Sequence, residues 1–126
     1  MEEKKKDTGP PLKILLADDT AVNVALATKL MKKRGHDITA VENGLEAYEA
    51  FQKDSFDVIL MDIHMPVMDG LESTQKIREY ESSNTSRRPT PIIAMTANNK
   101  QSDHENYLKG GMNGVITKPL EIKKVV

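Results

Sequence analysis

Five short apolar runs constrain the fold of this chain more than any other feature. They are separated by segments whose apolar residues recur at helical spacing. The five runs cover residues 13–17, 37–41, 57–61, 91–95 and 114–117. The run at 57–61 is a nearly unbroken apolar stretch, which is typical of a strand covered by helices on both faces of a parallel sheet. The alternation therefore predicts an α/β domain built from five βα units.

The segments between these runs have the pattern of helices. After the first run, four apolar side chains recur at helical spacing: Val22, Ala25, Leu26 and Leu30. Thr20 is a candidate cap for this helix, and Gly35 is a candidate stop signal. Later helices are expected at 45–51, 71–80 and 101–109, and the last one, at 120–126, is short or truncated.

Composition excludes several classes of protein. The 126 residues include no cysteine, so the chain has no disulfide framework, thiolate zinc site or cysteine nucleophile. The net charge of -1 gives no general attraction to nucleic acid or anionic lipid, and no apolar run approaches the length of a membrane helix. We expect one domain at 12–126, behind a flexible leader or linker at 1–11, located in the cytoplasm without contact to nucleic acid or membrane.

Polar side chains stand where four of the apolar runs end. They are Asp18 and Asp19 after the first run, Asp62 after the third, Thr96 after the fourth and Lys118 after the fifth. In a doubly wound parallel sheet with strand order 2-1-3-4-5, these positions share the carboxyl edge. That edge is where open α/β sheets bind their ligands, so the sequence predicts a site there.

Three carboxylates that meet at one edge need compensation. At about 4 Å and an effective dielectric of 20, each like-charge pair costs roughly 4 kcal/mol, a large share of a domain's net stability. Either one carboxyl group keeps its proton or a divalent cation binds. Oxygen ligands without His or Cys favour Mg²⁺, with Mn²⁺ as a second candidate.

This set of residues suits phosphoryl transfer. Asp62 lies on the central strand and is the candidate nucleophile, which would form an aspartyl phosphate. The hydroxyl of Thr96 and the ammonium of Lys118 could both contact phosphoryl oxygens. Each residue alone has an ordinary interpretation as a cap, a turn residue or a solvated charge, but the joint placement favours a functional site.

The three histidines have different expected roles. His36 and His104 lie in a turn and in a polar segment, so we expect both to be exposed to solvent. His64 follows Asp62 by two residues, and its backbone carbonyl is a candidate metal ligand beside Asp18, Asp19 and Asp62.

These residues resemble the receiver domains of two-component response regulators and hybrid histidine kinases. The most specific segment is Met-Asp-Ile-His-Met-Pro-Val-Met-Asp-Gly at 61–70, and the resemblance extends from about Leu12 to Leu120. Supporting segments are Leu-Ala-Asp-Asp at 16–19, Met-Thr-Ala at 95–97 and Thr-Lys-Pro at 117–119. Asn23, the Asp-Gly turn at 69–70 and the long loop at 81–90 make the chain most similar to receivers of hybrid kinases.

The resemblance implies a flavodoxin-like (βα)5 domain in which Asp62 accepts phosphate from a phosphohistidine. It also implies that Asp19, Asp62 and the His64 carbonyl bind Mg²⁺, with Asp18 acting through water, and that Thr96 and Lys118 contact the phosphoryl group. The expected partner is a histidine kinase or a histidine phosphotransfer protein. Such a domain is not a dedicated enzyme, although it catalyses its own phosphorylation and dephosphorylation, and the parent protein could be a histidine kinase.

Several alternatives stay open at this point. The domain could belong to a stand-alone response regulator, or it could be a degenerate receiver that serves as a binding module. A phosphohydrolase of the haloacid dehalogenase type would carry an aspartate two residues after the nucleophile, where this chain has His64. Val115 stands where many receivers carry a switching Tyr or Phe, so an aromatic switch that works with Thr96 is not expected here.

Overall fold

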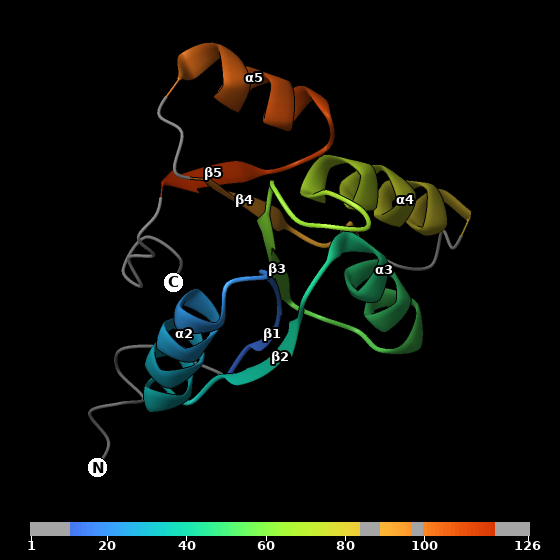
Figure 1. The fold of residues 1–126 in the computed structure, drawn as a ribbon. Helices are drawn as coiled ribbons and strands as arrows, with labels where there is room; N and C mark the ends of the chain where they lie inside the picture. The colour runs from blue at the N-terminus through green and yellow to red at the C-terminus, as the bar shows by residue number, and fades with distance from the viewer. Residues whose placement is uncertain (1–10, 84–88, 97–99, 118–126) are drawn as a thin grey trace.

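The computed structural model describes residues 11–83, 89–96 and 100–117, and a parallel sheet lies at its centre (Figure 1). Its five strands have the order β2-β1-β3-β4-β5. The strands are β1 (Lys13–Ala17), β2 (Asp37–Val41), β3 (Val58–Asp62), β4 (Ile92–Thr96) and β5 (Gly114–Thr117). The helices are α2 (Ala21–Lys33), α3 (Gly44–Lys53), α4 (Gly70–Ser83) and α5 (Gln101–Lys109). The predicted α/β class and strand order are confirmed.

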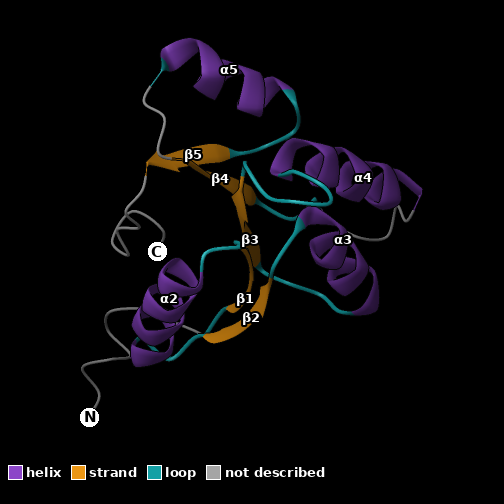
Figure 2. Cartoon of the chain, in the orientation of Figure 1, coloured by secondary structure: helices purple, strands orange, loops and turns teal. Residues whose placement is uncertain are grey.

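Helices cover both faces of the sheet (Figure 2). Alternate residues of each strand point to opposite faces. On one face, Ile14, Leu16 and Leu60 pack with Ala27 and Met31 of α2. On the other face, the strands contribute Leu15, Ala17, Ile59, Met61, Ile92 and Ala94 to a core with Phe51 of α3, Ile77 of α4 and Tyr107 of α5. Burial on both faces explains why the central strands are almost wholly apolar.

The strand register aligns the carboxyl ends of the sheet. Ala17 of β1 pairs with Met61 of β3, and Asp62 pairs with Met95 of β4. The residues directly after Ala17 and Met61 are therefore neighbours across the sheet. This register brings Asp18, Asp19, Asp62 and Thr96 to one edge, whereas Lys118 lies outside the described residues.

Helix α2 forms where the sequence predicts it, but the four apolar positions that suggested it are not its buried face. Val22 is 74% exposed and Leu26 is 41% exposed, whereas Ala27 and Met31 are buried. Thr20 occupies the N-cap position, but its side chain makes no capping hydrogen bond. Helical spacing predicted the helix and could not tell which of two apolar stripes faces the sheet.

The prediction that His36 is exposed is wrong. His36 is only 4% exposed, and its Nδ1 accepts a hydrogen bond from the N–H of Leu12 at 3.0 Å. Its Nε2 is buried and has no hydrogen-bond partner among the described residues. Burial, and secondarily the positive charge of Arg34, lowers the pKa of His36 below its ordinary value of 6.5. The side chain thus helps to close the sheet where the first two strands begin, a position that a local turn pattern does not reveal.

Some predictions lie outside the described residues. They concern the leader at 1–10, the short last helix at 120–126 and a cis peptide between Lys118 and Pro119, all of which stay predictions. Within the residues that the structure describes, no helix is long and apolar enough to cross a membrane.

Candidate functional site

Three carboxylates meet at the carboxyl edge of the sheet. Asp18 and Asp19 follow β1, Asp62 ends β3, and one ligand oxygen of each lies within 4.8 Å of the others. Asp18 is 1% exposed and Asp62 is 4% exposed, whereas Asp19 is open to solvent. The cluster therefore has two buried members and one that solvent can reach.

Backbone contacts fix Asp18 in this cluster. Its N–H donates to the carbonyl of Val41 at the end of β2, at 3.1 Å, so that residue 18 extends the pairing of β1 with β2. One carboxylate oxygen of Asp18 accepts from the N–H of Thr20 at 2.9 Å. The hydrogen bond turns the chain from the strand into α2 and holds this carboxylate in place.

The segment after Asp62 folds back against it. The N–H of Ile63 donates to the carbonyl of Met95 at 3.2 Å, and the N–H of Gly70 donates to the carbonyl of Ile63 at 2.9 Å. A Cβ atom at Gly70 would collide with the carbonyl oxygen of Asp62. Glycine at position 70 thus allows the start of α4 to press directly on the backbone of Asp62.

A strained turn lies inside this segment. Val67 has a φ of 69°, which is an outlier for a β-branched residue, and its side chain is 77% exposed. The N–H of Met68 donates to the carbonyl of Pro66 at 2.7 Å. These features describe a γ-turn of the rare type with a positive φ at its centre.

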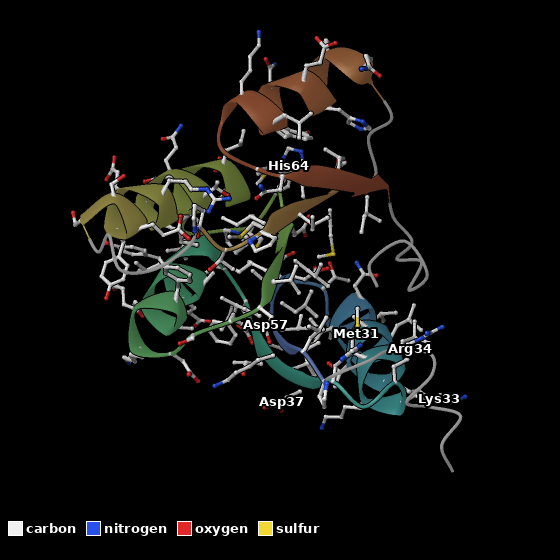
Figure 3. The ribbon with its side chains drawn as sticks, turned by 180° about the vertical axis from the view of Figure 1, so that it is seen from behind. Met31, Lys33, Arg34, Asp37, Asp57 and His64 are labelled. Atoms are coloured by element: carbon white, nitrogen blue, oxygen red, sulfur yellow. The ribbon has the colours of Figure 1, made fainter. Side chains whose placement is uncertain are left out.

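The remaining predicted site residues are Thr96, His64 and Lys118, and the structure describes the first two. Thr96 is 2% exposed at the end of β4, the strand beside β3. His64 is exposed and lies just beyond the carboxyl end of β3, whereas Asp57 lies just before the amino end of the same strand (Figure 3). Lys118 lies outside the described residues, so its place in the site remains a prediction.

A hollow of about 300 Å³ adjoins the acidic cluster between α2 and the end of β2. Asp18, Asp19 and Glu42 provide its acidic side. The remaining wall is small and apolar, formed by Ala21, Val24, Ala25, Ala40 and Val41. The hollow gives the carboxylates an open approach from the side of α2.

The chemistry of the cluster fits a hard divalent cation. All three side chains offer carboxylate oxygens, and hard cations such as Mg²⁺ prefer oxygen ligands. A cation would offset the repulsion between carboxylates that are held together with little solvent around two of them. The cluster is therefore a candidate metal centre next to the predicted nucleophile.

Sequence reasoning missed three features around this site. Glu42 adds a third acidic group to the wall of the hollow, Val67 adopts a positive φ, and Gly44 packs against the segment that follows Asp62. An Asn-Gly pair at 43–44 was visible in the sequence as a turn signal. Nothing in the local pattern indicated that it would contact residues more than 20 positions away.

The family model of the response regulator receiver domain matches residues 14–126. The chain is 39% identical over 140 residues to Probable histidine kinase 1 of Oryza sativa subsp. indica, covering 90% of this chain and 14% of that relative. It is 40% identical over 121 residues to Hybrid signal transduction histidine kinase B of Dictyostelium discoideum, covering 90% of this chain and 6% of that relative. The chain thus spans a small part of the length of these relatives.

Solved structures show the same fold. The receiver domain of Ssk1 from Saccharomyces cerevisiae, crystallised with the histidine phosphotransfer protein Ypd1, has a TM-score of 0.87 at 30% identity, covering 92% of this chain and 84% of that one. The receiver domain of a sensor histidine kinase from Pseudomonas aeruginosa PAO1, with magnesium in its active site cleft, has a TM-score of 0.80 at 35% identity, covering 92% of both chains. By family match, fold and acidic cluster, this chain belongs to the response regulator receiver domains of two-component phosphorelays.

Proposed function

We propose that this domain accepts a phosphoryl group on Asp62 from a phosphohistidine. The observation that carries the proposal is the meeting of Asp62 with Asp18 and Asp19 at the carboxyl edge of the sheet. A cluster of this kind costs stability unless it serves a ligand. Asp62 ends the central strand β3, and its buried carboxylate lies beside those of Asp18 and Asp19.

Asp18, Asp19 and Asp62, together with the backbone carbonyl of His64, would hold Mg²⁺. The bound cation supplies positive charge that offsets both the carboxylates and the incoming phosphoryl oxygens. Mn²⁺ has similar ligand preferences and is a second candidate. The oxygen-only donor set supports this assignment.

The transfer exchanges one bond for another. A carboxylate oxygen of Asp62 forms a bond to phosphorus while the bond between phosphorus and the imidazole nitrogen of the donor breaks, and the donor histidine is released. The buried hydroxyl of Thr96, on the neighbouring strand, is suited to donate a hydrogen bond to a phosphoryl oxygen. Lys118 is assigned by sequence to balance the charge of the phosphoryl group.

The partner would be a histidine kinase or a histidine phosphotransfer protein. The similarity to the Ssk1 receiver, which was crystallised with Ypd1, supports a phosphotransfer protein, and the similarity to hybrid kinases supports a place within a larger kinase chain. A chain without cysteine suits a reducing compartment, which supports a location in the cytoplasm. Since Val115 replaces the aromatic residue of many receivers, we infer that the output is the phosphate itself rather than an aromatic switch.

A phosphotransfer assay tests this function. A histidine phosphotransfer protein carrying radiolabelled phosphate is mixed with the domain and Mg²⁺, and the label is followed on both proteins. We expect label to pass to the domain in a form that is stable to acid and labile to base, as an acyl phosphate is, and to be absent from Asp62→Asn. Label that passes equally to Asp62→Asn would contradict the assignment of the acceptor.

A further inference from the structure

The first turns of α3 and α4 meet beside the segment that follows Asp62. The N–H of Gly44 donates to the carbonyl of Met68 at 2.8 Å. The hydroxyl of Ser73 donates to the carbonyl of Gly44, also at 2.8 Å, across 29 positions of sequence. Ser73 is 0% exposed. We call Gly44, Met68 and Ser73 the α3–α4 clamp.

The contacts of the clamp leave no room for a side chain at position 44. A Cβ atom on Gly44 would lie 2.5 Å from the carbonyl oxygen of Met68, 2.8 Å from that of Asp69 and 2.9 Å from the Cβ of Ser73. Two of these neighbours are backbone atoms, which cannot rotate away as the end of a side chain can. A larger residue at position 44 must therefore push α3 and the segment at 62–70 apart.

The clamp holds the strained turn at Val67. A positive φ at a β-branched residue persists only where the surrounding structure fixes it. Met68, the residue after Val67, is held by Gly44, and the segment is closed at its end by the hydrogen bond from Gly70 to Ile63. Two hydrogen bonds besides that of the γ-turn thus hold the strained residue in place.

The same contacts connect the clamp to Asp62, the proposed phosphoacceptor. Gly70 begins α4 and packs against the carbonyl oxygen of Asp62. Ser73, one turn further along α4, is tied to Gly44. A shift of α4 away from α3 therefore moves the residue that presses on the backbone of Asp62.

We propose that Gly44 and Ser73 are positioning residues, which hold the segment at 62–70 so that Asp62 meets Asp18 and Asp19. The inference rests on the proposed function, because the position of Asp62 matters only if its carboxylate binds a cation and accepts phosphate. It assigns a role in the site to a residue at the start of α3, which contributes no ligand.

Two substitutions test the clamp, and the chain offers a matched control. Gly44→Ala introduces the Cβ that the clamp excludes, and Ser73→Ala removes its buried hydroxyl. Gly35→Ala is the control, because Gly35 has a φ of +89° but no atom within 4 Å of an added Cβ. Gly35→Ala therefore strains the backbone without displacing a neighbour, so it reports a general loss of stability.

The first readout is Mg²⁺ affinity, measured by following backbone amide signals in an NMR titration that also shows whether each variant is folded. We expect Gly44→Ala to raise the dissociation constant for Mg²⁺ about tenfold or more, as loss of groups that orient metal ligands usually does, with a smaller rise for Ser73→Ala. Gly35→Ala should stay close to the wild type. Adding Val67→Gly to Gly44→Ala should restore part of the affinity, because a relaxed turn no longer depends on the clamp.

The second readout is hydrogen exchange of the Gly70 amide in the metal-free protein, which does not depend on Mg²⁺ binding. Faster exchange in both clamp variants and not in Gly35→Ala supports the inference. Folded clamp variants with the exchange rate and Mg²⁺ affinity of the wild type overturn it, and Ser73→Ala decides the matter if Gly44→Ala does not fold. A wild-type domain that binds no Mg²⁺ would contradict the proposed function, while the exchange data would still test the clamp.

Discussion

At the scale of single residues, the central feature is the acidic cluster of Asp18, Asp19 and Asp62. One carboxylate oxygen of each residue lies within 4.8 Å of the others. Two of the three side chains are buried, so solvent screens their repulsion weakly. A cation would bind at this site only in the folded state, because the unfolded chain does not bring the three groups together. Cation binding at this cluster would therefore be coupled to folding stability.

The coupling predicts a change in thermal stability with Mg²⁺. With free Mg²⁺ about tenfold above its dissociation constant, the free energy of unfolding should rise by about 1.4 kcal/mol over that in EDTA. Asp19→Asn keeps the size of the side chain and removes one charge, so the variant should be more stable than the wild type in EDTA and should gain less from Mg²⁺. Differential scanning calorimetry measures both effects. Equal gains from Mg²⁺ in the two proteins would exclude Asp19 as a metal ligand.

His36 predicts a second effect, on pH dependence. Burial, followed by the charge of Arg34, lowers the pKa of His36 in the folded state below 6.5, whereas the unfolded chain has the ordinary value. Well above pH 6.5 the residue is neutral in both states and its contribution to stability is complete. As the pH falls below 6.5 the unfolded state takes up the proton first, so stability decreases until the pH reaches the pKa of the folded state. Each unit of pKa depression corresponds to about 1.4 kcal/mol.

The test compares urea unfolding between pH 7.5 and 5 for the wild type, His36→Asn and His104→Asn. Asn at position 36 can still accept the hydrogen bond from Leu12 but does not titrate. We expect His36→Asn to flatten the decrease in stability, and His104→Asn, at a partly exposed position, to keep it. The same slope in all three proteins would show that His36 titrates normally in the folded domain.

At the scale of elements, Arg78 ties α4 to the amino ends of β4 and β5. Its guanidinium donates to Glu81 at 2.7 Å, to the carbonyls of Thr90 at 2.9 Å and Gly111 at 3.0 Å, and to Asn113 at 2.7 Å. The side chain of Glu81 is 6% exposed and also accepts from the N–H of Thr90 at 2.8 Å. The network lies at the edge of the sheet opposite to the site. It holds in place the residues that lead into β4 and β5.

Removing the guanidinium should leave the buried carboxylate of Glu81 without its charged partner. We expect Arg78→Met, which keeps much of the aliphatic stem, to lower the free energy of unfolding by about 2 to 3 kcal/mol. The exposed pair of Lys13 and Asp54, at 2.5 Å, is the comparison, and Asp54→Asn should change stability little. Urea denaturation measures both. If Arg78→Met is no more destabilising than Asp54→Asn, then the network does not hold these elements together.

Helix α2 shows what a sequence pattern can and cannot determine for an element. Its existence followed from apolar residues at helical spacing, but two such stripes overlap on this helix. The stripe of Val22 and Leu26 is exposed, and the stripe of Ala27 and Met31 faces the sheet. Which stripe is buried depends on how the chain turns after Asp18, and that turn is set by the hydrogen bond from Thr20 to the carboxylate of Asp18, a residue that is itself held by Val41 of β2.

At the scale of the whole molecule, the α/β class and the strand order could be predicted because the central strands β1, β3 and β4 are buried almost throughout and therefore read as apolar runs, although the edge strand β2 is largely exposed. The acidic cluster could be predicted because parallel strands bring their last residues to one edge. The burial of His36, the network of Arg78 and the packing of Gly44 could not be, since each depends on contacts between distant segments that leave no periodic signal. The strained turn at Val67 is of the same kind.

The central claim is that Asp62 is an acceptor for phosphate in a Mg²⁺-dependent reaction. The most direct measurement is the intact mass of the domain after incubation with acetyl phosphate, with Mg²⁺ or with EDTA, beside an Asp62→Asn variant treated in the same way. We predict a gain of one phosphoryl group in the wild type with Mg²⁺ and no gain in EDTA or in the variant. A wild-type domain that gains no phosphoryl group from acetyl phosphate or from a phosphorylated histidine phosphotransfer protein, or a variant that gains one, would contradict the claim.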